Sequence, residues 1–125
     1  MKIATGGTFI QRVEKAIRDF EEDDRKLLET LRTLKDHITK LEERVGEKKQ
    51  PGDLDKLDSA IESLNQLTDS QILASKKAWK SYEEFERECD GQLSRLDKLN
   101  ELQAVCKKRE RIAADLLCYS LGHLK

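Results

Sequence analysis

The residues that most often carry out chemistry are few in this chain and widely spaced. His37 and His123 have no cysteine or carboxylate around them at metal-ligand spacing. Cys118 lies near His123 in the sequence, but a nucleophilic pair also needs a third group to orient the histidine. Gly6-Gly7 lacks the spacing of a phosphate-binding loop. The sequence therefore predicts no catalytic residue, metal site or cofactor, and we expect that the chain is not an enzyme.

Cysteine usage indicates a reducing compartment. Cys89, Cys106 and Cys118 are odd in number and form no C-x-x-C pair, so we expect reduced thiols that pack as small apolar residues. Residues 1–7 lack the apolar core of a signal peptide, and no uncharged apolar run is long enough to span a bilayer. The expected compartment is the cytoplasm, with the nucleus as the alternative.

The charge balance bears on the class of partner. The chain has 24 Lys and Arg against 25 Asp and Glu, a net charge of -1. Nucleic-acid binders usually present a field of one sign, so nucleic acid is not an expected partner. The basic run at residues 107–111 could contact an anionic membrane, but Glu110 dilutes its charge and the opposite helix face is apolar. A solvated face is favoured, and a membrane surface is the less favoured reading.

A long heptad pattern predicts the helices that position the residues named above. Ten positions from Val13 to Val45 alternate steps of four and three, and all but Asp24 are apolar. A 3.5-residue repeat of this length indicates helices packed in a left-handed supercoil. The positions are Val13, Ile17, Phe20, Asp24, Leu27, Leu31, Leu34, Ile38, Leu41 and Val45.

Two further stripes complete the predicted fold. After a flexible segment at 1–7, Thr8 and Gln11 form a capping box, and helices are predicted at about 9–45, 54–89 and 92–121. The second stripe weakens at Thr68, Gln71 and Ser75, where a local stutter is expected. We predict one domain at 8–122, an all-α, antiparallel up-down-up three-helix bundle with coiled-coil packing.

The alternative fold depends on Asp90-Gly91. If these residues form a tight turn, three helices of similar length bury one another within one chain. If the helix continues through them, at a cost of about 1 kcal/mol for glycine, the chain is a long helical hairpin that forms an elongated dimer. In that dimer, residues 92–121 would pair between chains.

The bundle register predicts one specific polar contact. Parallel first and third helices bring the acidic run 21–24 level with the basic run 107–111, and we expect Asp24 to reach Arg109 or Arg111. A polar residue of this kind in a seam fixes register at some cost in stability. The same register gathers five of the six aromatic residues into one half of the bundle.

The residues that fall off the stripes are the candidate partner-binding surface. Trp79 is a candidate hot spot, because Trp and Tyr dominate binding energetics. Apolar residues that the bundle does not cover would form a strip for another helix, beside the basic run. The predicted set is Trp79, Val105, Lys107, Lys108, Arg109, Arg111, Ile112, Leu117, Tyr119 and Leu121.

The helix lengths, a tryptophan in a heptad and an acid-rich surface resemble spectrin-type repeats and other three-helix adaptor bundles. The tryptophan signature of the first helix in a spectrin repeat is missing, since Trp79 lies in the second stripe, and the chain is not assigned to that family. We expect a structural or adaptor protein of a cytoskeletal, trafficking or multi-subunit assembly that binds a helical protein partner. The alternative function is an elongated homodimer that scaffolds at a membrane surface or a polymer.

Overall fold

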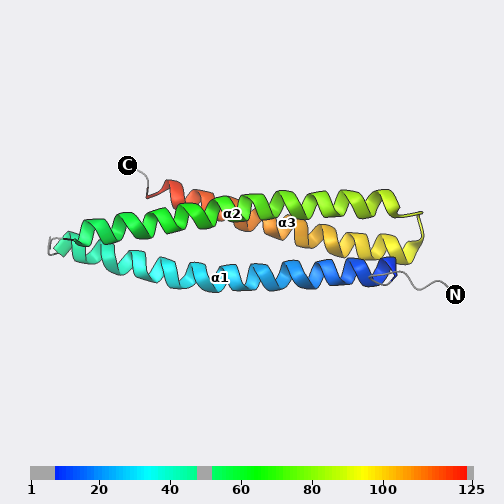
Figure 1. Cartoon of the computed structure of the whole chain (residues 1–125), viewed down its shortest axis with the longest axis horizontal. Coiled ribbons are helices and arrows are strands. Elements are labelled where there is room, and N and C mark those ends of the chain that lie inside the picture. Colours follow the sequence, from blue (N-terminus) through cyan, green and yellow to red (C-terminus); the bar gives the residue numbers. More distant parts are fainter. Residues whose placement is uncertain (1–7, 48–51, 124–125) are drawn as a thin grey trace.

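The computed structural model describes residues 8–47 and 52–123. These form three helices, α1 (Phe9–Glu47), α2 (Asp53–Glu88) and α3 (Leu93–Leu121), and each contacts the other two. The prediction of an all-helical chain with three mutually packed helices is confirmed. α1 and α3 run in one direction and α2 runs in the other (Figure 1). The predicted flexible segment 1–7 lies outside the described residues.

The ends of the helices follow from local chemistry. The capping box is confirmed, because the Thr8 amide donates to Gln11 Oε1 at 3.1 Å and the Gln11 amide donates to Thr8 Oγ1 at 3.2 Å. α2 ends at Glu88 and α3 begins at Leu93, so the chain turns at Asp90-Gly91 rather than continuing as one helix. Gly91 has a φ of 85°, a backbone conformation that glycine adopts without strain.

The apolar core consists of two clusters at different levels of the bundle. The first, the aromatic cluster, combines buried residues such as Phe9 and Leu102 with four half-buried rings. These rings are Phe20, Trp79, Tyr82 and Phe85. The predicted gathering of five aromatic residues in one half is confirmed.

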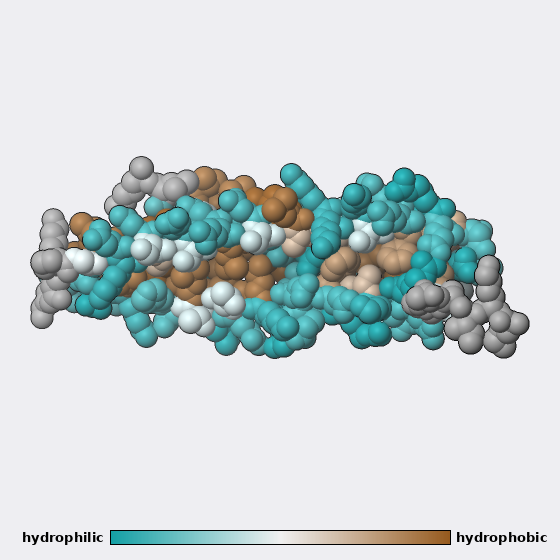
Figure 2. Space-filling model, in the orientation of Figure 1, coloured by the Kyte–Doolittle hydropathy of each residue, from teal (hydrophilic) through white to brown (hydrophobic). Residues whose placement is uncertain are grey.

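The second, the aliphatic cluster, contains no buried aromatic ring among the described residues. Its buried members are Leu31, Ile38, Leu41, Ala60, Leu64, Ile112 and Leu116. Figure 2 shows the two halves as a darker and a paler hydrophobic area with hydrophilic side chains between them.

A buried polar layer separates the clusters, and each helix contributes one residue to it. Arg109 Nε on α3 donates to Asp24 Oδ1 on α1 at 2.9 Å, and Gln71 Nε2 on α2 donates to the same oxygen at 3.2 Å. Arg109 also donates to the carbonyl oxygens of Ala74 and Phe20. Because Asp24 and Arg109 are each only 3% exposed, these bonds replace the water that both charges lose on folding.

The stutter expected in α2 is wrong. Thr68, Gln71 and Ser75 stay in phase with Leu64 and Ala78, and all five are buried. Polar side chains keep this register because they find partners there, since Thr68 Oγ1 donates to the Leu64 carbonyl at 2.8 Å and Gln71 reaches Asp24. Thr68, Gln71 and Ser75 are therefore the part of α2 that packs in the core around the polar layer.

Candidate interaction surface

Three residues of the predicted partner-binding set are unavailable to a partner. Val105 and Ile112 are each 8% exposed and Arg109 is 3% exposed, because they pack inside the bundle. The prediction that Val105 and Ile112 belong to an exposed apolar strip is wrong, and so is the prediction that Arg109 is an accessible member of the basic run. A helix that contacts two neighbours buries a wider stripe than the heptad seam alone, so residues on its flanks are covered too.

Tyr119 is also engaged within the chain. It packs against the aliphatic cluster, its ring lies 4.6 Å from that of His123, and Lys35 Nζ on α1 lies 4.7 Å above it. Burial raises the pKa of the Tyr119 hydroxyl above its ordinary value. His123 in turn lies 3.4 Å from Glu42, so this end of α3 is attached to α1.

The remaining predicted residues are accessible. Leu117 is 43% exposed and Leu121 is 55% exposed, and their spacing of four places them on one side of α3. Lys107, Lys108 and Arg111 are exposed, so the predicted basic run separates into three solvent-facing cations and one buried arginine. Arg111 is not the residue that meets Asp24, since the hydrogen bond comes from Arg109.

Trp79 lies half-buried in a groove of about 440 Å³ between α2 and α3, which we call the Trp79 groove. Its Nε1 donates to Glu110 Oε2 across the groove at 2.6 Å, and its ring meets Tyr82 edge to face at 5.6 Å. These two contacts hold the Trp79 ring in place at the groove. The lining residues are Ile72, Ser75, Lys76, Trp79, Lys80, Glu83, Glu110 and Ala113.

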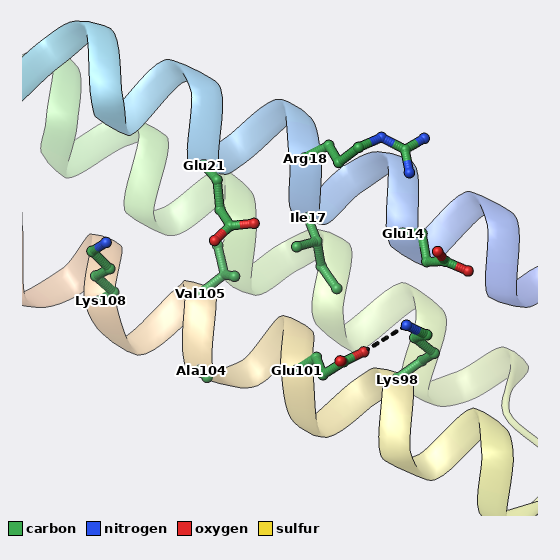
Figure 3. A pocket seen from close by; sticks show the side chains of 9 residues that line it. All are labelled: Glu14, Ile17, Arg18, Glu21, Lys98, Glu101, Ala104, Val105 and Lys108. Atoms are coloured by element: carbon green, nitrogen blue, oxygen red, sulfur yellow. Dashed lines mark ion pairs between the residues drawn. The ribbon is translucent and has the colours of Figure 1, made fainter.

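A second groove of about 430 Å³ lies between α1 and α3 and carries charges of both signs (Figure 3). Ile17, Ala104 and Val105 provide its apolar surface, and Lys98 pairs with Glu101 at 2.9 Å. That hydrogen bond raises the pKa of the Lys98 ammonium. The other charged residues around it are Glu14, Arg18, Glu21 and Lys108, so the groove has no dominant charge.

The residue types of a hydrolytic triad occur together in one place, between α1 and α2. His37, Asp55, Ser59 and Ser63 line the same groove there. A triad requires hydrogen bonds from serine to histidine and from histidine to aspartate. Among residues 8–47 and 52–123, His37 makes no side-chain hydrogen bond or ion pair. The groove has the right residue types without the contacts that would activate a serine.

The three cysteines have different surroundings. Cys106 is fully buried in the aromatic cluster, and burial raises the pKa of its thiol to about 11. Cys89 is half-buried at the end of α2, and Cys118 is exposed on α3. In the part of the chain that the structure describes, no group of three or more histidine, cysteine or acidic side chains is arranged to hold a metal ion.

Comparisons with known proteins found no match to this chain. No protein-family model matches the chain, and neither a curated protein nor a solved structure matches it. None of the helices in the described ranges has the length and apolar character needed to cross a membrane.

Proposed function

We propose that this chain is a non-enzymatic structural or adaptor module that binds a helical protein partner in a cytoskeletal, trafficking or multi-subunit assembly. The observation that carries the proposal is the exposure of Leu117 and Leu121 beside the Trp79 groove. Adjacent exposed apolar residues on one helix side are typical of surfaces that take up another helix. The proposed compartment is the cytoplasm.

We further propose that the bundle is a monomer with coiled-coil packing in the up-down-up order. The elongated homodimer needs the apolar stripe of residues 92–121 to pair with a second chain. Leu99, Leu102 and Cys106 in that stripe are at most 3% exposed, and they pack in the aromatic cluster of their own chain. The stripe is thus already occupied, which favours the monomer over the dimer.

Light scattering on a sizing column at two concentrations tests the monomer. We expect a mass near 14.4 kDa at both concentrations. An elongated species whose mass doubles with concentration would favour the homodimer and its scaffolding role. This measurement comes first, because a binding experiment on a self-associating chain reports two equilibria at once.

Affinity purification from cells tests the interaction. Leu117→Gln/Leu121→Gln removes the exposed apolar pair, and Leu93→Gln is the matched control because Leu93 is 78% exposed at the opposite end of α3. We expect proteins that co-purify with the wild type to be lost with the double variant and kept with Leu93→Gln. Equal recovery with all three chains would contradict a binding role for this surface.

A further inference from the structure

The half of the bundle around the aliphatic cluster has long stretches of α2 and α3 without a cation. Lys and Arg make up 24 of the 125 residues of the chain, yet residues 57–75 of α2 and 112–121 of α3 contain none. The two stretches lie side by side, because Ser120 on α3 donates a hydrogen bond to Asn65 on α2 (Figure 1). This part of the α2–α3 surface can therefore carry negative charge only, unlike the Trp79 groove, which two lysines and two glutamates line.

Three acids of α2 lie on the side that faces α3. Asp58, Glu62 and Asp69 are all exposed, and within the described ranges none of them forms an ion pair. Their steps along the helix are in phase with Asn65, which bonds to α3, and with Ile72, which lines the Trp79 groove. The acids therefore form a row along the boundary between the two helices, about 17 Å from end to end.

Exposed leucines lie beside this row. Leu73 follows Asp69 by one turn and is 66% exposed, and Leu117 and Leu121 on α3 are 43% and 55% exposed. Hydrogen bonds between the two helices set an antiparallel register that brings Leu117 level with the turn of α2 between Asp69 and Leu73. Apolar and acidic side chains thus share one surface, which we call the acidic strip. The acidic strip consists of Asp58, Glu62, Asp69, Leu73, Leu117 and Leu121.

The charge of the acidic strip selects among the possible occupants. An anionic membrane and a nucleic acid are both repelled by the row of carboxylates. A two-fold interface uses the same patch on both copies, so a second copy of this chain would bring two acidic rows together. A partner that carries cations beside apolar side chains satisfies both the carboxylates and the leucines.

Resting on the proposed function, we infer that the acidic strip accepts a basic amphipathic helix from a partner protein. The apolar side of that helix covers Leu73, Leu117 and Leu121, and lysines or arginines on its flank meet the three carboxylates. From Asp58 to Leu73 the strip is about 22 Å long, which is about four turns of a helix laid along it. Charge complementarity of this kind sets the choice of partner and speeds association more than it adds affinity.

Fluorescence anisotropy of a dye-labelled peptide, titrated with the full chain, tests the inference. The probe has about 20 residues, with leucine at heptad positions a and d and lysine at e and g. One comparison peptide carries glutamate at e and g, and a second has the composition of the probe in a scrambled order without heptads. We expect saturable binding of the probe and about tenfold weaker binding of both comparison peptides.

A charge reversal makes the test specific to the acidic strip. Glu62→Lys/Asp69→Lys is expected to weaken the probe about tenfold and to strengthen binding of the glutamate peptide. The matched control is Glu84→Lys/Asp97→Lys, which makes the same change of charge at exposed acids of α2 and α3 in the aromatic half. Because salt screens distant charges, the control is expected to change either affinity by less than about twofold. Circular dichroism of both variants checks that the helices are retained.

Four results would overturn the inference. These are no binding of the probe, equal binding of the probe and the glutamate peptide, equal binding of the probe and the scrambled peptide, and an affinity that the charge reversal leaves unchanged. The cellular partners separate the inference from the proposed function. If they are lost with Leu117→Gln/Leu121→Gln but kept with the charge reversal, the proposed function stands and the basic helix is wrong. Loss of the same partners with both variants supports both.

Discussion

The aromatic half and the aliphatic half of the bundle contain the same three helices, but the helices end differently in the two halves. At the aromatic end, α2 turns into α3, and Arg12 on α1 forms two hydrogen bonds with Glu88 on α2. At the aliphatic end, α3 stops before α1 and α2 do, which Figure 1 shows clearly. The exposed Leu117 and Leu121 lie at this end, where α3 stops first.

The two halves are held together by different contacts. The aromatic half has large rings packed edge to face, including Phe9 and Phe85 at 5.8 Å, and the Arg12–Glu88 ion pair across its end. Both halves leave leucines exposed, with Leu93 at 78% at the start of α3 and Leu117 and Leu121 at 43% and 55% near its end. The polar layer of Asp24, Gln71 and Arg109 lies between them and joins all three helices by hydrogen bonds.

The largest expected effect comes from breaking that layer. Arg109→Met leaves the Asp24 carboxylate buried without its cation, and we expect it to lower the free energy of unfolding by about 3–5 kcal/mol. Chemical denaturation followed by circular dichroism measures this. A loss below about 1 kcal/mol would mean that water reaches Asp24 and that the layer does not carry a buried charge.

The matched variant replaces the whole layer. Asp24→Leu/Gln71→Leu/Arg109→Met removes every buried polar group of the layer together, so most of the stability is expected to return. If the layer sets register, this variant gives broadened or doubled amide resonances although its helix content is unchanged. A single sharp set of resonances would show that the apolar seams fix the register alone.

The next effect compares the two cores directly. Leu102→Ala in the aromatic cluster and Leu64→Ala in the aliphatic cluster each remove a fully buried leucine, and such changes cost about 2–5 kcal/mol. We expect the cost to be larger for Leu102, because the aliphatic half, which has an open end, can close around a cavity more easily. Denaturation of both variants measures the difference, and a larger cost for Leu64 would reverse our ranking of the halves.

The sequence predicted the helices well because the heptad is long and the breaks are chemically marked. α1 runs two residues beyond its predicted end at Val45, and α2 and α3 lie within one residue of their predicted bounds. The Asp24–Arg109 contact followed from placing α1 and α3 parallel. Whether that contact sets the register stays a prediction until the layer is replaced.

Two parts of the site could not be read from the heptad. Gln71 interrupts the apolar stripe of α2 in the sequence. In the structure it lies in the core and donates to Asp24, so this polar position was the signal that α2 also enters the polar layer. The off-stripe residues Val105 and Ile112 looked exposed, because a linear pattern does not show that each helix contacts two neighbours. The Trp79 groove depends on which side chains of α2 and α3 lie level, and this needs three dimensions.

The smallest expected effect concerns the closed end and depends on pH. The hydrogen bond from Arg12 lowers the pKa of Glu88 below its ordinary value of 4.5. The Arg12–Glu88 ion pair therefore stabilises the fold at pH values above 4.5. Its contribution is lost as the pH falls through the lowered pKa of Glu88. Because both side chains are substantially exposed, Glu88→Gln is expected to cost less than about 1 kcal/mol at neutral pH.

The measurement is the difference in unfolding free energy between wild type and Glu88→Gln, at pH 7 and at a series of acid pH values below 4.5. We expect a small difference at neutral pH that declines along this series, because the wild-type carboxyl is progressively protonated and becomes uncharged, as the amide of the variant is. Glu84→Gln is the control, since Glu84 is exposed and forms no ion pair within the described ranges. A difference that persists in acid would mean that Glu88 acts through packing against its neighbours, so that the aromatic end is closed by its rings and not by its ion pair.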